Sequence, residues 1–164
     1  MRALVITIST RAAAGVYEDV SGPVLVAGLE ALGFDVAGPT VVPDGPEIES
    51  VLLGAVHDRF DVVLTTGGTG LTPNDVTPEH TARVITREAP GIAEAIRAAG
   101  VAKGVPTAAL SRGRAGLAGE TLIVNLPGSK GGVKDGMAVL SELLVHAVEQ
   151  IRGGDHPRTD DGAA

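Results

Sequence analysis

The chain has 164 residues, a formal net charge of −7 at pH 7 and no cysteine. This length fits one domain, and the missing cysteine excludes disulfides and thiolate metal sites. The negative charge argues against binding to nucleic acid or to an anionic membrane surface. No apolar run is long enough to span a bilayer, and a predicted strand begins at once without a signal sequence. We therefore expect a soluble, cytoplasmic protein.

The first half of the chain alternates between predicted strands and helices. Short β-branched apolar runs predict the strands, and apolar residues at helical spacing predict the helices. In chain order these elements are a strand over Ala3–Ile8, a long loop over Ser9–Asp19, a helix over Ser21–Leu32, a strand over Phe34–Val42 that Gly38-Pro39 could interrupt, and a helix from Glu47 to about Arg59.

The second half begins with a continuous apolar run over Val62–Thr66, which is typical of a strand covered on both faces. The elements after it are a helix over Pro78–Arg87, a break at Pro90-Gly91, a helix over Ile92–Ala99, a strand or extended segment over Thr107–Leu110, a loop over Ser111–Gly116, a strand over Thr121–Leu126 and a last helix over Val133–Ile151. Residues 153–164 are small and polar, so we expect a disordered tail after a single domain over residues 1–152.

Strands that alternate with helices predict right-handed β-α-β units around a parallel sheet. We therefore expect an α/β fold with three layers, α/β/α, and a mostly parallel central sheet. In such sheets ligands bind beyond the carboxyl ends of the strands. The loops expected at that edge are Ser9–Asp19, Pro43–Glu47, Gly67–Thr77 and Pro127–Gly132.

A glycine-rich loop follows the strand that ends at Thr66. Its glycines leave no Cβ in the way, so successive backbone N–H groups can converge on an anion. A carboxylate, Asp75, lies a few residues further on, and Mg²⁺ bridges phosphate oxygens to such carboxylates. The loop therefore predicts a phosphate–metal site, although glycines after a strand also make plain tight turns. The candidate ligand-binding residues in it are Gly67, Gly68, Thr69, Gly70 and Thr72.

Other polar residues have local structural explanations. Thr77–Glu79 has the pattern of a helix N-cap, a first-turn proline and a first-turn acid. Asp44, with Glu47 three residues on, resembles a capping box, so the local sequence favours a structural role for Asp44. Arg11 fits equally a phosphate ligand and a solvated side chain. Lys130 lies near a helix N-terminus, where a bound phosphate would offset its unfavourable position.

Five segments, in register along nearly the whole chain, resemble the molybdenum-cofactor biosynthesis family. They are Ser9-Thr10-Arg11 with Gly15–Asp19, Pro43-Asp44, Thr65–Gly70 with Asp75–Glu79, Leu110-Ser111-Arg112, and Asn125–Ser129. The likeness is to the small single-domain members called MogA and MoaB, whose domain also occurs in gephyrin-like proteins. It implies a MogA/MoaB-like fold. One departure is Thr10, because many relatives carry Asp before the Arg.

The resemblance implies a molybdopterin adenylyltransferase. Family enzymes join AMP from Mg-ATP to the terminal phosphate of molybdopterin and release pyrophosphate, so ATP and molybdopterin are the expected substrates and Mg²⁺ the expected cofactor. By matching position, Asp44 and Asp75 correspond to the family's two essential carboxylates, which we expect to hold the metal or orient its waters. The remaining substrate contacts correspond to Gly67–Gly70, Ser111, Arg112, Pro127, Gly128 and Ser129.

The resemblance also implies partners and leaves two alternatives open. Family members form homotrimers, or hexamers built from trimers, and pass the product to a MoeA-like metal-insertion protein. One alternative is a non-catalytic molybdopterin-binding or scaffold protein, since a retained fold does not guarantee retained chemistry. The other is a CinA-like nucleotide pyrophosphatase. That family prefers Gly-Gly-Leu-Gly-Pro-Thr in the central loop, where this chain has Gly67-Gly68-Thr69-Gly70-Leu71-Thr72.

Overall fold

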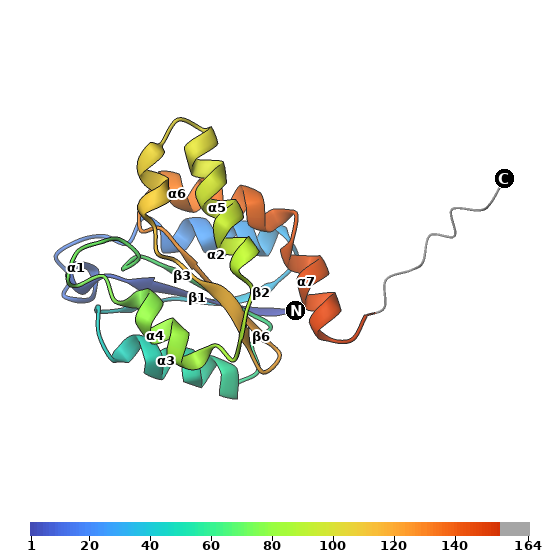
Figure 1. The fold of residues 1–164 in the computed structure, drawn as a ribbon. Coiled ribbons are helices and arrows are strands. Elements are labelled where there is room, and N and C mark those ends of the chain that lie inside the picture. Colours follow the sequence, from blue (N-terminus) through green and yellow to red (C-terminus); the bar gives the residue numbers. More distant parts are fainter. Residues whose placement is uncertain (155–164) are drawn as a thin grey trace.

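A computed structural model describes residues 1–154, and within them a six-stranded sheet forms the centre of the molecule (Figure 1). Its strand order is β2-β1-β3-β6-β5-β4. The first four strands in this order are parallel. At the other edge β5 pairs antiparallel with β6, and β4 pairs antiparallel with β5. The strands are β1 (Arg2–Ile8), β2 (Asp35–Val42), β3 (Val62–Thr66), β4 (Arg87–Glu88), β5 (Ala115–Ala118) and β6 (Thr121–Leu126).

Helices cover both faces of the sheet. The helices are α1 (Thr10–Ala13), α2 (Gly22–Ala31), α3 (Glu47–His57), α4 (Thr77–Val84), α5 (Pro90–Ala102), the 3₁₀ helix η1 (Pro106–Leu110), α6 (Lys130–Ser141) and α7 (Leu144–Ile151). In Figure 1, α2, α5 and α6 lie on one side and α3 and α4 on the other. Within residues 1–154, no helix combines the length and apolar character that a membrane crossing requires.

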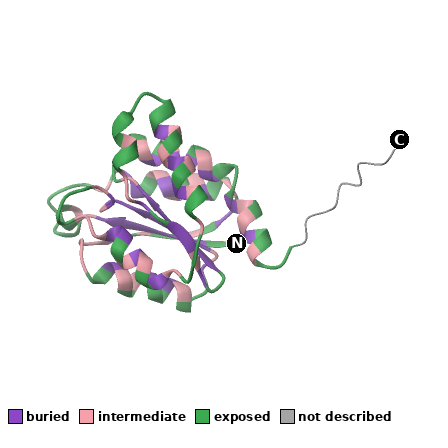
Figure 2. Cartoon of the chain, in the orientation of Figure 1, coloured by how far each residue is buried: buried purple, intermediate pink, exposed green. Residues whose placement is uncertain are grey.

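Two hydrophobic clusters show why the layers form. Successive β1 residues point to opposite faces, so Ala3 and Val5 pack with α2, α5, α6 and α7, whereas Leu4 and Ile6 pack with α3 and α4. The central strands β1, β3 and β6 are buried on both faces along nearly their whole length (Figure 2), as the apolar run of β3 predicts. The expected three-layer α/β/α fold with a mostly parallel sheet is therefore confirmed.

Several predicted elements differ in the structure. The loop after β1 contains the short helix α1, and Thr107–Leu110 forms η1 instead of a strand. Gly38-Pro39 does not end β2. A cis peptide and a shift in pairing against β1 carry the strand through it. Pro90 begins α5 rather than breaking a helix, because proline fits the first helical turn.

The last predicted helix is two helices. α6 ends at Ser141 and α7 begins at Leu144, and both Leu140 and Leu144 are buried in the same cluster. α7 ends at Ile151, where the last helix was predicted to end. Residues 155–164 of the predicted tail lie outside the described part of the chain.

A buried polar contact joins β3, β6 and α4. The side-chain amide of Asn125 donates to the hydroxyls of Thr65 (2.9 Å) and Thr81 (3.0 Å), and its oxygen accepts from the backbone N–H of Arg114 (3.1 Å). The side chains of Asn125, Thr65 and Thr81 are buried. Because a buried polar group is costly without a partner, this set fixes α4 against the strands that carry the glycine-rich loop.

We expect Asn125→Ala to lower the free energy of unfolding by about 2–3 kcal/mol, since it leaves buried hydroxyl and N–H groups without their partner. Urea denaturation followed by circular dichroism measures the change. The matched control is Glu120→Gln, in the exposed turn between β5 and β6, which we expect to stay within about 0.5 kcal/mol of the parent. Equal stability of the two variants would contradict the structural role of Asn125.

Candidate functional site

The loops after β1, β2, β3 and β6 meet at one edge of the sheet, as expected for the carboxyl ends of parallel strands. The strand order reverses between β1 and β3, because β2 lies on the far side of β1. A cavity of about 320 Å³ lies at this point and is lined by residues of all four loops. A second cavity of about 400 Å³ adjoins it and shares Gly68, Asp75 and Gly128 as lining residues.

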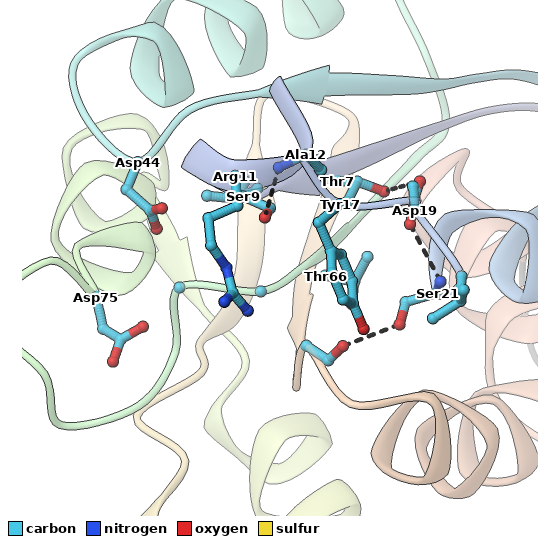
Figure 3. A pocket seen from close by; sticks show the side chains of 15 residues that line it. Thr7, Ser9, Arg11, Ala12, Tyr17, Asp19, Ser21, Asp44, Thr66 and Asp75 are labelled. Atoms are coloured by element: carbon cyan, nitrogen blue, oxygen red, sulfur yellow. Dashed lines mark hydrogen bonds between the residues drawn. The ribbon is translucent and has the colours of Figure 1, made fainter. Parts of the chain in front are cut away.

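Carboxylates dominate the first cavity. Asp44 and Asp75 face it from one end, Tyr17 and Asp19 lie toward the other, and Arg11 lies between them (Figure 3). The Arg11 guanidinium stacks on the Tyr17 ring, 5.3 Å from its centroid. Phosphates that enter this cavity would meet more negative than positive charge from the protein, so the site requires an added cation to hold a polyphosphate.

Asp44 is not a helix cap, so the capping-box prediction is wrong. The N-cap of α3 is Pro46, and it makes no side-chain cap. One Asp44 oxygen, Oδ2, instead accepts from the backbone N–H (3.2 Å) and the hydroxyl (2.8 Å) of Thr10. This contact spans the loops after β1 and β2 and cannot be read from the residues next to Asp44.

Asp75 is held in the same way. Its Oδ2 accepts from the backbone N–H (2.9 Å) and the hydroxyl (2.7 Å) of Thr72. The Oδ1 atoms of Asp44 and Asp75 accept no hydrogen bond from residues 1–154. Thr72 therefore acts on Asp75 and lies outside the lining of both cavities, although the sequence suggested that it contacts a ligand.

These two carboxylates fit a Mg²⁺ ion that is shared with phosphates. Mg²⁺ prefers oxygen ligands and commonly takes only one or two carboxylates, with water and phosphate oxygens filling the other positions. The donor set here offers one unengaged oxygen from each aspartate. Within the described residues, no group of three or more His, Asp or Glu side chains is arranged to hold a metal without such help.

The glycine-rich loop passes very close to neighbouring backbone. A Cβ on Gly67, whose φ is +102°, would lie 2.2 Å from the carbonyl oxygen of Ile8. A Cβ on Gly68, whose φ is +61°, would lie 2.3 Å from the hydroxyl of Thr77 and 2.9 Å from Asp44 Oδ1. Only glycine fits at either position.

Thr77 is a loop anchor rather than the predicted N-cap. It is the first residue of α4, and its buried hydroxyl donates to the carbonyl of Gly67 (3.0 Å) while its N–H donates to that of Gly68 (3.1 Å). The N–H of Gly67 donates to Leu126 (3.2 Å), so it is not available to a ligand. The N–H groups of Gly68, Thr69 and Gly70 donate to no described residue, and they are the amides left for an anion.

The second cavity gathers most of the other predicted residues. It is lined by Gly68, Thr69 and Gly70, by Ser111 and by the segment Pro127–Ser129, together with apolar side chains of α5 and η1. The Ser111 hydroxyl lies 3.3 Å from that of Thr69. Ser129 caps α6, because its hydroxyl accepts from the N–H of Gly132 (3.1 Å). Lys130 lines neither cavity.

Arg112 lies beside the loop, but its side chain is directed at protein acceptors. It donates to the backbone carbonyls of Gly70 and Asp75 and to the carboxylate of Glu79. The hydrogen bond from the Arg112 guanidinium holds the pKa of Glu79 below its usual value, although partial burial opposes that shift. Glu79 is therefore an ion-pair partner as well as a first-turn acid.

Sequence reasoning missed Tyr17 and Asp19 as individual site residues. Asp19 accepts from the Thr7 hydroxyl (2.7 Å) and from the N–H groups of Ser21 (3.1 Å) and Gly22 (2.9 Å), so it fixes the start of α2 beside the cavity. Both residues lie in a segment that carries the family resemblance, which was the available signal. Their place in the cavity depends on the fold of the loop after β1.

Free backbone amides and two carboxylates lie together at the switch point of the sheet in this α/β domain, an arrangement that is suited to binding an anion with a cation. The model of a family described as a probable molybdopterin binding domain matches residues 4–146. The chain therefore belongs to this molybdopterin-binding family, as its five sequence segments predicted.

Individual relatives agree with this family. The molybdopterin adenylyltransferase of Helicobacter pylori is 35% identical over 156 residues, covering 91% of this chain and 86% of that protein. The solved structure of the molybdopterin biosynthesis Mog protein from Mycobacterium ulcerans has a TM-score of 0.88 and 49% identity, covering 93% of this chain and 97% of that one.

A longer relative is similar over one part only. The molybdenum cofactor biosynthesis bifunctional protein of Synechococcus elongatus is 39% identical over 155 residues, covering 94% of this chain but 48% of that protein. The chain thus spans about half the length of this bifunctional relative.

We expect Gly68→Ala to destabilise the protein by about 1–3 kcal/mol more than Gly119→Ala, because both glycines have a φ of +61° but only Gly68 lacks room for a methyl group. Gly119 has no atom within 4 Å of the added Cβ, so its variant measures backbone strain alone. Urea denaturation of both variants gives the difference. An equal loss of unfolding free energy in the two variants would mean that the loop shifts to accommodate the methyl group without a further loss of stability.

Proposed function

We propose that this chain is a molybdopterin adenylyltransferase that acts in molybdenum cofactor biosynthesis. The proposed reaction joins AMP from Mg-ATP to the terminal phosphate of molybdopterin and gives adenylyl-molybdopterin and pyrophosphate. The observation that carries the proposal is the pair Asp44 and Asp75, each with one unengaged oxygen, beside the free amides of Gly68–Gly70. The naming of relatives as molybdopterin adenylyltransferases supports it.

The chemistry needs positioning more than a strong base. An oxygen of the pterin phosphate is already ionised and attacks the α-phosphorus of ATP. The bond from that phosphorus to the bridging oxygen breaks, and pyrophosphate leaves with the bonding pair. Such phosphoryl-type transfers depend on alignment and on neutralising charge on the phosphate oxygens. Backbone amides and a cation held by carboxylates are suited to both tasks.

The proposed metal residues are Asp44 and Asp75. When bound there, Mg²⁺ would neutralise charge on the ATP phosphates. Thr10 and Thr72 each hold one oxygen of an aspartate and so orient the other oxygen toward the cavity. Because both threonines are uncharged, they do not reduce the negative charge that attracts the cation.

We propose that the two cavities divide the substrates between them. The second cavity joins Ser111, the loop amides and the Pro127–Ser129 segment to an apolar wall. That combination suits a phosphate attached to a ring system, which here is the pterin with its terminal phosphate. The acidic first cavity suits the ATP phosphates with their cation. Asp75 lines both cavities, which supports a reaction centre at their boundary.

The remaining assignments are further parts of the same proposal. Residues 1–152 form the molybdopterin-binding domain, the protein is a cytoplasmic homotrimer or a hexamer built from two trimers, and the adenylylated product passes to a MoeA-like metal-insertion protein. The name "bifunctional" on a relative about twice as long as its matched part supports a second activity that works next to this one.

Pyrophosphate release from Mg-ATP, measured with and without molybdopterin, tests the proposal. We expect release that depends on the pterin, and a loss of roughly 100-fold or more in Asp75→Asn and Asp44→Asn. The matched control is Asp35→Asn, an exposed aspartate at the start of β2, which we expect to keep the parent rate.

Two other results would each select another function. A folded parent that binds molybdopterin but releases no pyrophosphate would indicate a binding or scaffold protein. Cleavage of a dinucleotide pyrophosphate without any pterin would indicate a CinA-like pyrophosphatase. Full activity in both aspartate variants would contradict the assignment of Asp44 and Asp75 as metal residues.

A further inference from the structure

The Arg112 side chain makes an unusually complete set of contacts with the glycine-rich loop. Each of its three guanidinium nitrogens has a protein acceptor: Nε donates to the carbonyl of Gly70 (2.8 Å), and the two terminal nitrogens donate to the carbonyl of Asp75 and to the Glu79 carboxylate. The backbone N–H of Arg112 also donates to the carbonyl of Thr69 (2.8 Å). One residue thus contacts the loop near its start, at Asp75 and in the helix that follows.

These contacts hold the backbone of Asp75, a residue that lines both cavities. Arg112 holds the backbone carbonyl of Asp75, while Thr72 holds one of its carboxylate oxygens through an N–H and a hydroxyl. With the backbone and one oxygen both fixed, the direction of the remaining oxygen is set. The rest of the loop around Thr72 and Asp75 is exposed and has few other restraints.

We propose that Arg112 and Glu79 form a brace that sets the position of Asp75, and that Arg112 is a positioning residue rather than a ligand of the substrate phosphate. The brace is the set of contacts from Arg112 to Gly70, Asp75 and Glu79. Its effect on catalysis rests on the proposed function, because it acts through Asp75. Its effect on the loop does not.

The geometry of the ion pair separates it from an ordinary surface contact. Exposed pairs contribute little to stability on their own, and the side chains of Arg112 and Glu79 are 34% and 49% exposed. Glu79, however, orients a planar fork whose other two nitrogens bind loop carbonyls, and only arginine offers such a fork. The Arg112 hydrogen bond is the largest cause of the lowered pKa of Glu79, so the contact favours the ionised form of this carboxylate.

The chain contains a natural control for this brace. Arg114 and Glu88 form a second pair with an N–O distance of 2.6 Å and similar exposure, 44% and 46%. Within the described residues the Arg114 side chain donates to Glu88 and not to the glycine-rich loop, and its pair joins β4 to the residue before β5. Its charge is the smallest of the causes that lower the pKa of Glu79, behind the Arg112 hydrogen bond. Loss of this pair removes an arginine–glutamate contact of the same kind without touching Asp75.

The experiment compares Arg112→Gln, Arg112→Lys, Glu79→Gln and the Arg112→Gln/Glu79→Gln double variant with Arg114→Gln in the full chain. Amide hydrogen exchange of Thr72, followed by NMR, reports the loop directly because this N–H donates to Asp75. Pyrophosphate release at varied substrate concentrations separates kcat from KM.

We expect the Thr72 amide to exchange at least about tenfold faster in Arg112→Gln, with kcat lower by roughly 10–100-fold and KM within about threefold of the parent, because the brace is lost without loss of a substrate contact. Arg112→Lys should not restore either value, since lysine supplies no fork. Glu79→Gln should show smaller changes in the same direction. The double variant should be no worse than Arg112→Gln, because both residues act through one link.

Unchanged exchange of Thr72 in Arg112→Gln and Glu79→Gln would overturn the brace. A large rise in KM with unchanged exchange would also overturn it and make Arg112 a substrate ligand. If Arg114→Gln changed the Thr72 exchange rate and kcat as much as Arg112→Gln, the effects would reflect a general loss of stability, and the brace would likewise be overturned. If Arg112→Gln does not fold, Glu79→Gln decides by the same readouts. A parent protein without pyrophosphate release would refute the proposed function alone, because the exchange rates decide the brace by themselves.

Discussion

The passage of Gly67 past the end of β1 is the constraint on which the site depends. A side chain there would collide with the carbonyl of Ile8, and the N–H of Gly67 is bonded to Leu126 at the end of β6. A Cβ on Gly128 would in turn lie 3.2 Å from the Cα of Gly67. Three parallel strands thus end within contact of one glycine, which lines the first cavity next to Gly68, a residue that lines both cavities. Any bulkier residue would separate the strand ends that bring the site residues together.

Elements with strong local patterns could be predicted from the sequence. The continuous apolar run of β3 and the glycines after it gave the centre of the sheet and the place of the loop, because burial on both faces and freedom at φ are local demands. The pattern of the glycine-rich loop already indicated Asp75 as a site residue, whereas Asp44 came only from the family resemblance, and the fold brings both to one cavity. The alternation of strands and helices was enough to predict the three layers of the fold.

What could not be predicted depends on partners far apart in the chain. Asp44 has a local capping pattern, yet its partner is Thr10, 34 residues earlier. Arg112 lies in a predicted polar loop and only the resemblance gave it a role, as a substrate contact, yet its side chain donates to the carbonyls of Gly70 and Asp75. The pattern of Thr107–Leu110 is too short to separate an extended segment from a 3₁₀ turn. In each case the deciding contact forms only after the sheet has brought the loops together.

The threonine partners of Asp44 and Asp75 have one more consequence. Each carboxylate is held by neutral donors, and the cavity contains a third aspartate, Asp19, but only one cationic side chain, Arg11, so its lining keeps an excess of negative charge. The carboxylates of Asp44, Asp75 and Asp19 therefore repel one another at the point where the strand ends meet. A cation that binds the folded chain in preference to the unfolded one removes this repulsion and stabilises the fold by mass action. On the proposed function, folding stability and Mg²⁺ binding at Asp44 and Asp75 are therefore coupled, and the concentration of free Mg²⁺ is one of the variables that set how stable this end of the sheet is.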